Sequence, residues 1–160
     1  MSTILEELSK SLPDAHESAR VTIRLLAALI AGAIIGLQRE RSHAPAGLRT
    51  HILVCMGVAL FMTVGADVGM DLDALSRLIQ GIAAGIGFLG AGAILKMKDS
   101  LEIHGLTTAA GVWMTSAIGV AIGLGKLGTA AIALAFAWFV LAVVIKAEPR
   151  IRNPDDRALP

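Results

Sequence analysis

The chain has 160 residues, of which 55% are hydrophobic and 17% are charged, and it contains 17 glycines and no tyrosine. Soluble globular chains carry roughly 25% charged residues, so this composition argues against an ordinary water-soluble domain and predicts a membrane protein. The formal net charge of +1 gives no electrostatic reason to expect a nucleic-acid partner. The single cysteine, Cys55, falls in an apolar run, which excludes a disulfide framework or a thiolate metal site.

Residues 1–20 form a polar amino-terminal segment that precedes the first long apolar stretch. Its acidic residues have the wrong sign for the first part of a cleaved signal peptide, so we expect the first hydrophobic segment to be retained. Apolar residues fall on one helical face before Pro13-Asp14 restarts the chain. The segment is predicted either to lie flat on the outer membrane surface or to be a frayed polar terminus.

Five apolar stretches are candidates to cross a hydrocarbon core, which is about 30 Å thick and needs roughly 20 residues of helix. In chain order they are Val21–Leu37, Ile52–Val68, Leu78–Leu95, Leu106–Leu124 and Leu127–Ile145. Only Gly125 and Lys126 separate the last two, which predicts a tight helical hairpin. We therefore predict an all-α polytopic membrane helix bundle of five transmembrane helices over residues 21–146.

Basic residues divide unequally between the two sides of this predicted bundle. Nine lie on the side of the carboxyl terminus and five on the side of the amino terminus. Short loops rich in Lys and Arg stay in the cytoplasm, so we place the amino terminus outside and the carboxyl terminus inside. Residues 147–160 contain three prolines and mixed charges, which predicts a short disordered cytoplasmic tail.

The chain contains two similar helix–loop–helix units. Arg24 and Arg77 open the first and third spans, and the motif Gly47-Leu48-Arg49-Thr50 corresponds to Gly105-Leu106-Thr107-Thr108. The offset is 53 residues at the arginines and 58 at the motifs, so a five-residue insertion separates the units. Because each unit crosses twice, the predicted internal repeat is parallel, with its axis along the membrane normal. The alternative is that spans rich in Gly, Ala and Leu resemble each other by composition alone.

Small residues recur at helical spacing within the spans, a pattern that lets transmembrane helices pack closely. It predicts helix packing at Gly32, Gly36, Gly81, Gly85, Gly87, Gly90, Gly92 and Gly111. We expect Gly85→Leu or Gly111→Leu to force the helices apart and disrupt the bundle. The alternative for the third span is that its glycines unwind the helix and expose backbone carbonyls to an ion.

Polar residues gather in the first cytoplasmic loop and in its counterpart before the fourth span. Headgroup anchoring explains Arg39 and Arg41, whereas Arg49 falls within the repeated motif. We expect Arg49, Thr50, Thr107 and Thr108 to meet near the cytoplasmic centre of the bundle and to form one binding or gating site, with Arg49 as its single fixed charge. The planar guanidinium of Arg49 would hold a carboxylate or phosphate, with Glu40 as the nearest internal partner. Arg49 as a mere topological anchor is the alternative. The candidate binding or regulatory residues are Arg39, Glu40, Arg41, Gly47, Arg49, Thr50, His51, Thr107 and Thr108.

No nucleophile, base or metal cluster in the sequence shows the spacing that an enzyme needs. The four histidines, His16, His43, His51 and His104, are scattered at predicted interfaces and not at metal-ligand intervals. We therefore predict no catalytic residue and no cofactor, and we assign no metal ligand.

Four motifs together resemble the MgtC/SapB family of bacterial inner-membrane proteins, in the family's order and spacing from about Arg24 to Leu141. They are Gly36-Leu37-Gln38-Arg39-Glu40-Arg41, Pro45-Ala46-Gly47-Leu48-Arg49-Thr50-His51, Gly87-Phe88-Leu89-Gly90-Ala91-Gly92 and Gly105-Leu106-Thr107-Thr108-Ala109-Ala110. The resemblance implies a multi-pass protein linked to magnesium limitation and to survival of pathogens inside macrophages. It also implies a membrane partner, either the F-type ATP synthase or a cation pump, and leaves a homo-oligomer open. Many relatives add a carboxyl-terminal cytoplasmic domain, whose functions are not expected here.

Three functions are compatible with these features. We favour a regulatory membrane protein that binds another integral membrane protein under low magnesium or acid stress, because no carboxylate lies deep inside a span and Mg²⁺ prefers oxygen ligands with carboxylates among them. The second is a transporter or channel for magnesium or another ion, lined by Gln80, Thr107 and Thr108 along the glycine-rich third span. The third is a purely structural assembly factor.

Overall fold

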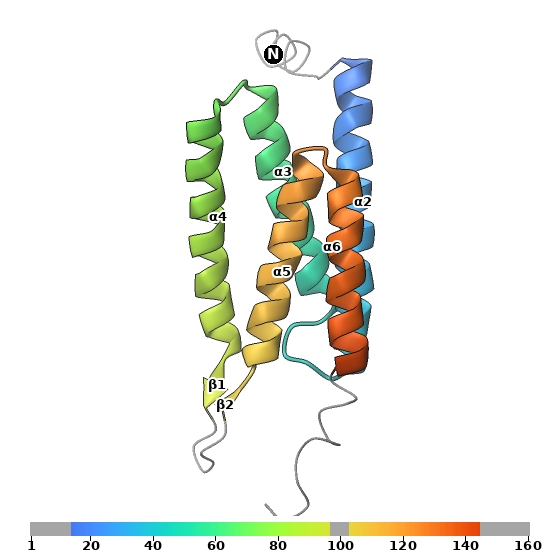
Figure 1. Ribbon diagram of the computed structural model, residues 1–160, viewed down its shortest axis with the longest axis vertical. Helices are drawn as coiled ribbons and strands as arrows, with labels where there is room; N and C mark the ends of the chain where they lie inside the picture. Colours follow the sequence, from blue (N-terminus) through green and yellow to red (C-terminus); the bar gives the residue numbers. More distant parts are fainter. Residues whose placement is uncertain (1–13, 97–102, 145–160) are drawn as a thin grey trace, which may run out of the picture.

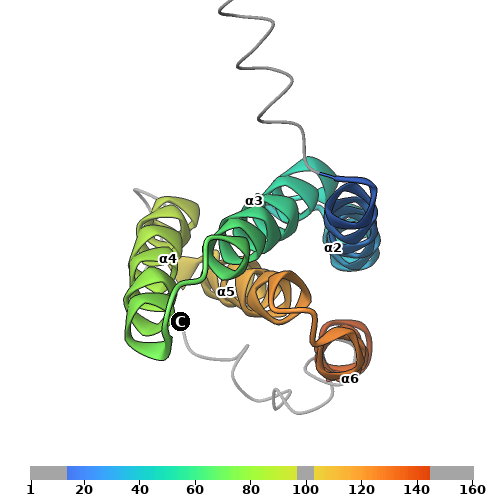
Figure 2. The ribbon, with the colours of Figure 1, turned by 90° about the horizontal axis from the view of Figure 1, so that it is seen from above.

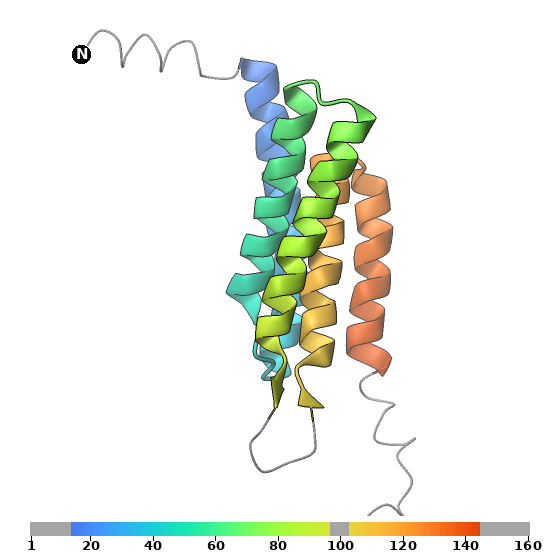
Figure 3. The same ribbon diagram turned by 90° about the vertical axis from the view of Figure 1, so that its left-hand side faces the viewer.

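The computed structural model describes residues 14–96 and 103–144 of the chain. These residues form a bundle of helices that run up and down beside one another (Figures 1 and 3). The helices are α2 (Ala15–Arg41), α3 (Leu48–Asp67), α4 (Leu72–Ala93), α5 (Leu106–Gly123) and α6 (Leu127–Phe139), which continues as the π-helical turn η1 (Val140–Val144). Between α4 and α5, the two-residue strands β1 (Leu95–Lys96) and β2 (Ile103–His104) pair antiparallel. The predicted all-α membrane helix bundle is confirmed.

Four helices, α2 to α5, are long and apolar enough to cross a membrane. The fifth apolar helix, Leu127–Val143, is shorter than these four. It nevertheless lies along α5 and covers a similar height of the bundle (Figure 3). Gln38 Nε2 of α2 also donates a hydrogen bond to the Leu141 carbonyl at 3.3 Å, which holds the end of this helix against the bundle.

Helix α2 begins earlier than the predicted span because Asp14 caps it: the Asp14 carboxylate accepts a hydrogen bond from the Glu17 N–H at 2.7 Å. Residues 15–20 therefore belong to α2, which begins six residues before the apolar stretch predicted to cross the membrane. The boundary at residue 20 between the polar segment and the transmembrane part stays a prediction. The prediction for the apolar residues before Pro13 lies outside the described residues, as does the predicted tail at 147–160. At its other end α2 runs through Arg41, past the end of the apolar stretch at Leu37.

Connections alternate between the two ends of the bundle. The end that holds residues 42–47 and the β1–β2 hairpin is called the lower end, as it is drawn in Figure 1. Residues 68–71 and 124–126 lie at the upper end. Helix α2 begins at the upper end, and α6 ends at the lower end. The units α2–α3 and α4–α5 run in the same directions, which a parallel repeat requires.

Helix α5 occupies the centre of the bundle and contacts α2, α3, α4 and α6. Seen from above, α4 lies on one side of α5, and α2 and α6 lie on the other (Figure 2). The largest core cluster lies where α2, α3, α5 and α6 meet, and it includes Ile35, Cys55 and Ile118, each at most 1% exposed. Cys55 is fully buried.

Glycines allow the helices of this core to touch through their backbones. A Cβ at Gly32 of α2 would lie 2.6 Å from the His51 carbonyl oxygen of α3, and one at Gly123 of α5 would lie 2.6 Å from the Ala59 carbonyl oxygen. Real Cβ atoms essentially never come so close, so only glycine fits at either position. The contacts follow from the small-residue spacing read in the sequence.

Helix α4 differs, because most of its surface lies away from the rest of the chain. Of its residues, only Ile86 and Gly90 are buried. A Cβ at Gly81, Gly85, Gly87 or Gly92 would meet no atom of the described chain within 4 Å. The prediction that Gly85→Leu disrupts the bundle is therefore wrong for a single chain. Unwinding of the third span is not observed either, since α4 is a continuous helix from Leu72 to Ala93.

Candidate functional site

Three polar side chains are buried between α2, α3 and α5 near the lower end, and they are called the polar cluster. They are Arg39, which is 5% exposed, Thr108, which is 2% exposed, and His51, which is fully buried. Arg39 Nη2 donates a hydrogen bond to Thr108 Oγ1 at 2.7 Å. This bond joins the last turn of α2 to the first turn of α5, although the two residues are 69 positions apart in the chain.

The imidazole of His51 lies between two glycines. Its Nδ1 is 2.8 Å from the Gly47 carbonyl oxygen, which only accepts hydrogen bonds, so Nδ1 carries a proton. A Cβ at Gly36 of α2 would lie 3.3 Å from His51 Cβ, and one at Gly111 of α5 would lie 3.6 Å from His51 Nε2. Gly36 therefore lets α2 pack closely against the backbone of α3 at His51, and Gly111 lies in ordinary van der Waals range of the imidazole.

The cluster has two levels. Arg39 comes three residues after Gly36 on α2, and Thr108 comes three residues before Gly111 on α5. Since α2 descends to the lower end and α5 rises from it, the Arg39–Thr108 bond lies about one helical turn closer to that end than His51. Two buried nitrogens of the cluster, Arg39 Nε and His51 Nε2, have no hydrogen-bond partner within the described chain.

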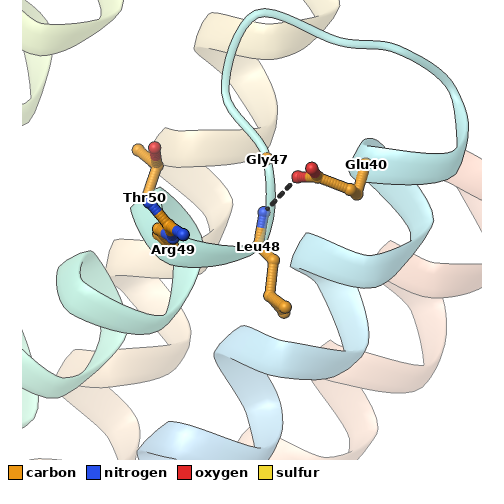
Figure 4. Close-up of a pocket in the computed structure, with 5 residues that line it drawn as sticks. All are labelled: Glu40, Gly47, Leu48, Arg49 and Thr50. Carbon is orange, nitrogen blue, oxygen red and sulfur yellow. Dashed lines mark hydrogen bonds between the residues drawn. The ribbon is translucent and has the colours of Figure 1, made fainter.

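Glu40 is not part of this cluster and has a separate role at the beginning of α3 (Figure 4). Its Oε2 accepts a hydrogen bond from the Leu48 N–H at 2.9 Å and so caps the beginning of α3. Gly47 makes this contact feasible, because a Cβ there would overlap the Glu40 carboxylate. An open pocket of about 550 Å³ lies here, lined by Glu40, Gly47, Leu48, Arg49 and Thr50.

Glu40→Ala is expected to lower the free energy of unfolding by about 1 kcal/mol, because it removes the acceptor for an otherwise free helix N–H. Glu40→Gln is the matched control, since its amide oxygen still accepts that hydrogen bond. Thermal unfolding of the purified protein in detergent measures the difference. Equal melting temperatures for the alanine variant and the parent would show that the cap contributes nothing.

The structure changes the role expected for the two arginines. Arg49 and Thr50 are exposed on the first turn of α3. Arg41 of α2 and Thr107 of α5 are exposed as well. Within residues 14–96 and 103–144, Arg49 forms no ion pair with Glu40. The expectation that Arg49 meets Thr108 is wrong, because Arg39 takes that place. The expectation that Arg39 only anchors the chain at the headgroups is wrong for the same reason.

The sequence contained a signal for this arrangement. Each residue of the polar cluster continues the buried stripe of its own helix at steps of three or four residues. These stripes are Ala28, Gly32, Ile35 and Arg39 on α2; His51, Cys55, Val58 and Met62 on α3; and Thr108, Val112, Thr115 and Gly119 on α5. Among the arginines near the lower end, Arg39 is the one whose spacing from Gly32 and Ile35 continues the buried stripe of its helix, and this spacing identifies it as the buried arginine.

No carboxylate of the described residues joins the polar cluster. In the part of the chain that the structure describes, the acidic residues are all exposed, and they lie at or near helix ends: Asp14, Glu17, Glu40, Asp67, Asp71 and Asp73. The same part contains no group of three or more His, Cys, Asp or Glu residues that could hold a metal ion. Among the described residues, the cluster therefore combines one guanidinium, a hydroxyl that accepts a hydrogen bond from it, and an imidazole.

Comparison with known proteins agrees with the architecture. The chain is 48% identical over 116 residues to protein SrpB of Synechococcus elongatus, 47% identical over 116 residues to "Putative magnesium transporter YhiD" of Escherichia coli K12, and 42% identical over 104 residues to protein MgtC of Salmonella typhimurium. The matches cover 66%, 68% and 65% of this chain and 64%, 53% and 43% of those relatives, so the chain matches only part of their length. No solved structure matches.

Residues 25–150 match the family model described as MgtC family, a segment that contains α3, α4, α5, α6 and most of α2. The polar cluster and the glycines that surround it lie within this segment. The match covers well over half of the chain. This multi-pass membrane protein therefore belongs to the MgtC family.

Proposed function

We propose that this chain is a protein of the bacterial inner membrane that serves magnesium homeostasis and stress or virulence by regulating another integral membrane protein, such as the F-type ATP synthase. Family membership supports the link to magnesium, since one relative is named as a magnesium transporter. The lower end of the bundle carries Arg39, Arg41 and Arg49, so the positive-inside rule favours a cytoplasmic lower end and an outside amino terminus.

The observation that carries this proposal is the open face of α4. Gly81, Gly85 and Gly92 lie on one stripe of α4 that the described chain does not cover. Phe88 belongs to the same stripe, between Gly85 and Gly92, and is 81% exposed, so the stripe presents one aromatic side chain flanked by glycines. In a bilayer, small residues support association because they let a second helix approach closely and gain dispersion contacts. Glycines inside the bundle allow its own helices to pack closely, whereas these glycines are available for contact with a helix of a partner.

The position of the acidic residues supports regulation over transport. All the described carboxylates are exposed and lie at or near helix ends, and none lies between helices in the middle of the bundle. Ion pathways through a membrane are usually marked by ionisable residues that face the bundle interior. The buried ionisable residues Arg39 and His51 are potential cations at the lower end.

Gly85→Leu tests the proposal directly. We expect the variant to accumulate and melt like the parent, because a Cβ at this position would meet no atom of its own chain within 4 Å, but to lose the partner. Affinity purification of the tagged chain from cells grown in low magnesium, with quantification of ATP synthase subunits, is expected to show about a tenfold loss, equivalent to about 1.4 kcal/mol of binding free energy. Gly57→Leu is the matched control, since Gly57 of α3 is also in open space but lies outside α4. Equal recovery from both variants would reject α4 as the partner surface.

A second function, transport of magnesium or another ion, is favoured by the name of the Escherichia coli relative. Uptake of labelled magnesium into lipid vesicles that contain only the purified chain separates the two functions. The regulatory proposal predicts uptake equal to that of empty vesicles. Uptake that saturates with magnesium concentration would establish transport instead.

A further inference from the structure

Arg39 is a buried cation that has no carboxylate partner among the residues that the structure describes. Within residues 14–96 and 103–144 the one ion pair joins Arg20 to Asp67 at 3.1 Å, near the upper end. The only side-chain partner of the Arg39 guanidinium there is the neutral hydroxyl of Thr108. Withdrawing a charge from water carries a penalty that a neutral hydroxyl offsets only in part. The charge of Arg39 therefore calls for an anion that the described chain does not supply.

The field around the polar cluster also favours an anion. Helices α3 and α5 both begin at the lower end, so their positive N-terminal ends flank the cluster. His51 lies in the first turns of α3, and Thr108 lies in the first turn of α5. The beginning of α5 has no side-chain cap, because Gly105 occupies the N-cap position. Helix N-termini bind phosphate and other oxyanions through this field and their free N–H groups.

Two unpartnered nitrogens complete the arrangement. Arg39 Nε is a donor, and His51 Nε2 is an acceptor while the ring is neutral, because Nδ1 holds the proton. Inorganic phosphate that carries one proton accepts from the first atom and donates to the second. A phosphatidylglycerol headgroup, whose phosphodiester carries no proton, can do the same with a phosphate oxygen and a glycerol hydroxyl. Both side chains are at least 95% buried, so bulk water does not satisfy these atoms.

We propose that the polar cluster of Arg39, His51 and Thr108 is a binding site for one phosphate-type oxyanion, supplied either as inorganic phosphate or as a lipid headgroup. Arg39 lies two residues from the end of α2, so a group at the lower surface of the bundle has about one helical turn to pass. The Thr108 hydroxyl holds the guanidinium in position from the opposite helix. This site stands independently of the partner surface on α4.

The test measures thermal unfolding of the full chain in a maltoside detergent, which contains no phosphate group, with inorganic phosphate or with chloride at equal ionic strength. Saturating phosphate is expected to raise the melting temperature by roughly 4 °C or more relative to chloride. A second arm omits inorganic phosphate and adds phosphatidylglycerol to the detergent. A shift in the first arm identifies free phosphate as the ligand, and a shift in the second arm alone identifies the lipid headgroup.

Variants separate a specific site from general charge effects. Arg39→Gln and Thr108→Val are expected to lose the shift, whereas Arg41→Gln keeps it, because Arg41 lies in the same last turn of α2 but is exposed. If Arg39→Gln does not fold, phosphorus NMR tests the site in the parent instead. Binding is expected to broaden the line of inorganic phosphate in the presence of the parent, and Arg41→Gln is expected to broaden it equally. No shift and no broadening in either arm, or equal shifts in Arg39→Gln and the parent, would overturn the proposal.

Discussion

Gly32→Ala is expected to reduce folded protein in the membrane to a small fraction of the parent level, although it adds one methyl group. That methyl would lie 2.6 Å from the His51 carbonyl oxygen and 2.7 Å from Ile52 Cα. Both are backbone atoms, so no side chain can rotate away and α2 must separate from α3. Overpacking typically costs about 1–3 kcal/mol, and a clash with backbone falls at or above the upper end of that range.

The control for this prediction is the same substitution at Gly57. A Cβ there would meet nothing within 4 Å, so Gly57→Ala should be neutral or should stabilise α3 by up to about 1 kcal/mol through helix propensity. Quantitative immunoblots of membranes and melting curves in detergent measure both variants. Gly32→Ala protein that accumulates and melts like the parent would show that α2 and α3 do not cross as closely as described.

Arg39→Lys is expected to abolish support of growth in low magnesium almost as completely as Arg39→Ala. The lysine keeps the charge but loses the planar fork that reaches Thr108 and presents Nε to the rest of the polar cluster. A compact ammonium in this buried position is also harder to desolvate. The measurement is growth of a strain that depends on this protein, with membrane abundance determined in parallel.

Arg49→Lys is the matched substitution, and the structure predicts that it retains growth because Arg49 is exposed on the first turn of α3. This result reverses the ranking that the repeated motif suggests. Loss of growth with Arg49→Lys, together with normal growth of Arg39→Lys, would restore the motif-based site at Arg49. Equal loss at both positions would mean that the lower end acts through its total charge.

Hydropathy was sufficient to predict the order of the apolar helices in the described residues, four of which have the length that a bilayer requires and the last of which is shorter. The prediction Leu106–Leu124 differs from α5 by one residue, since Gly105 and Gly125 lie next to its two ends. The first span was predicted too short at both ends. Hydropathy falls where the side chains become polar, but the helix continues through residues such as Gln38 and Arg39, which have good helix propensity.

Burial was harder to predict because it depends on how one helix is rotated against another. Arg39 and Arg41 are two residues apart and therefore point to different sides of α2, yet composition treats them alike. The same limit applies to the glycines. Gly32 and Gly85 belong to similar stripes, but the first lies against α3 and the second faces away from the chain. A single sequence shows the stripe without showing what covers it.

The burial of Cys55 makes the natural chain a practical background for spectroscopic labelling. Its thiol is fully enclosed in the core and is the only one in the sequence, so thiol reagents should leave the folded parent unmodified. A cysteine introduced at an exposed position of α4, such as Phe88, would then be the single reactive site. Spin labels or fluorophores placed there would report distances to a partner or to a second copy without prior replacement of a core residue.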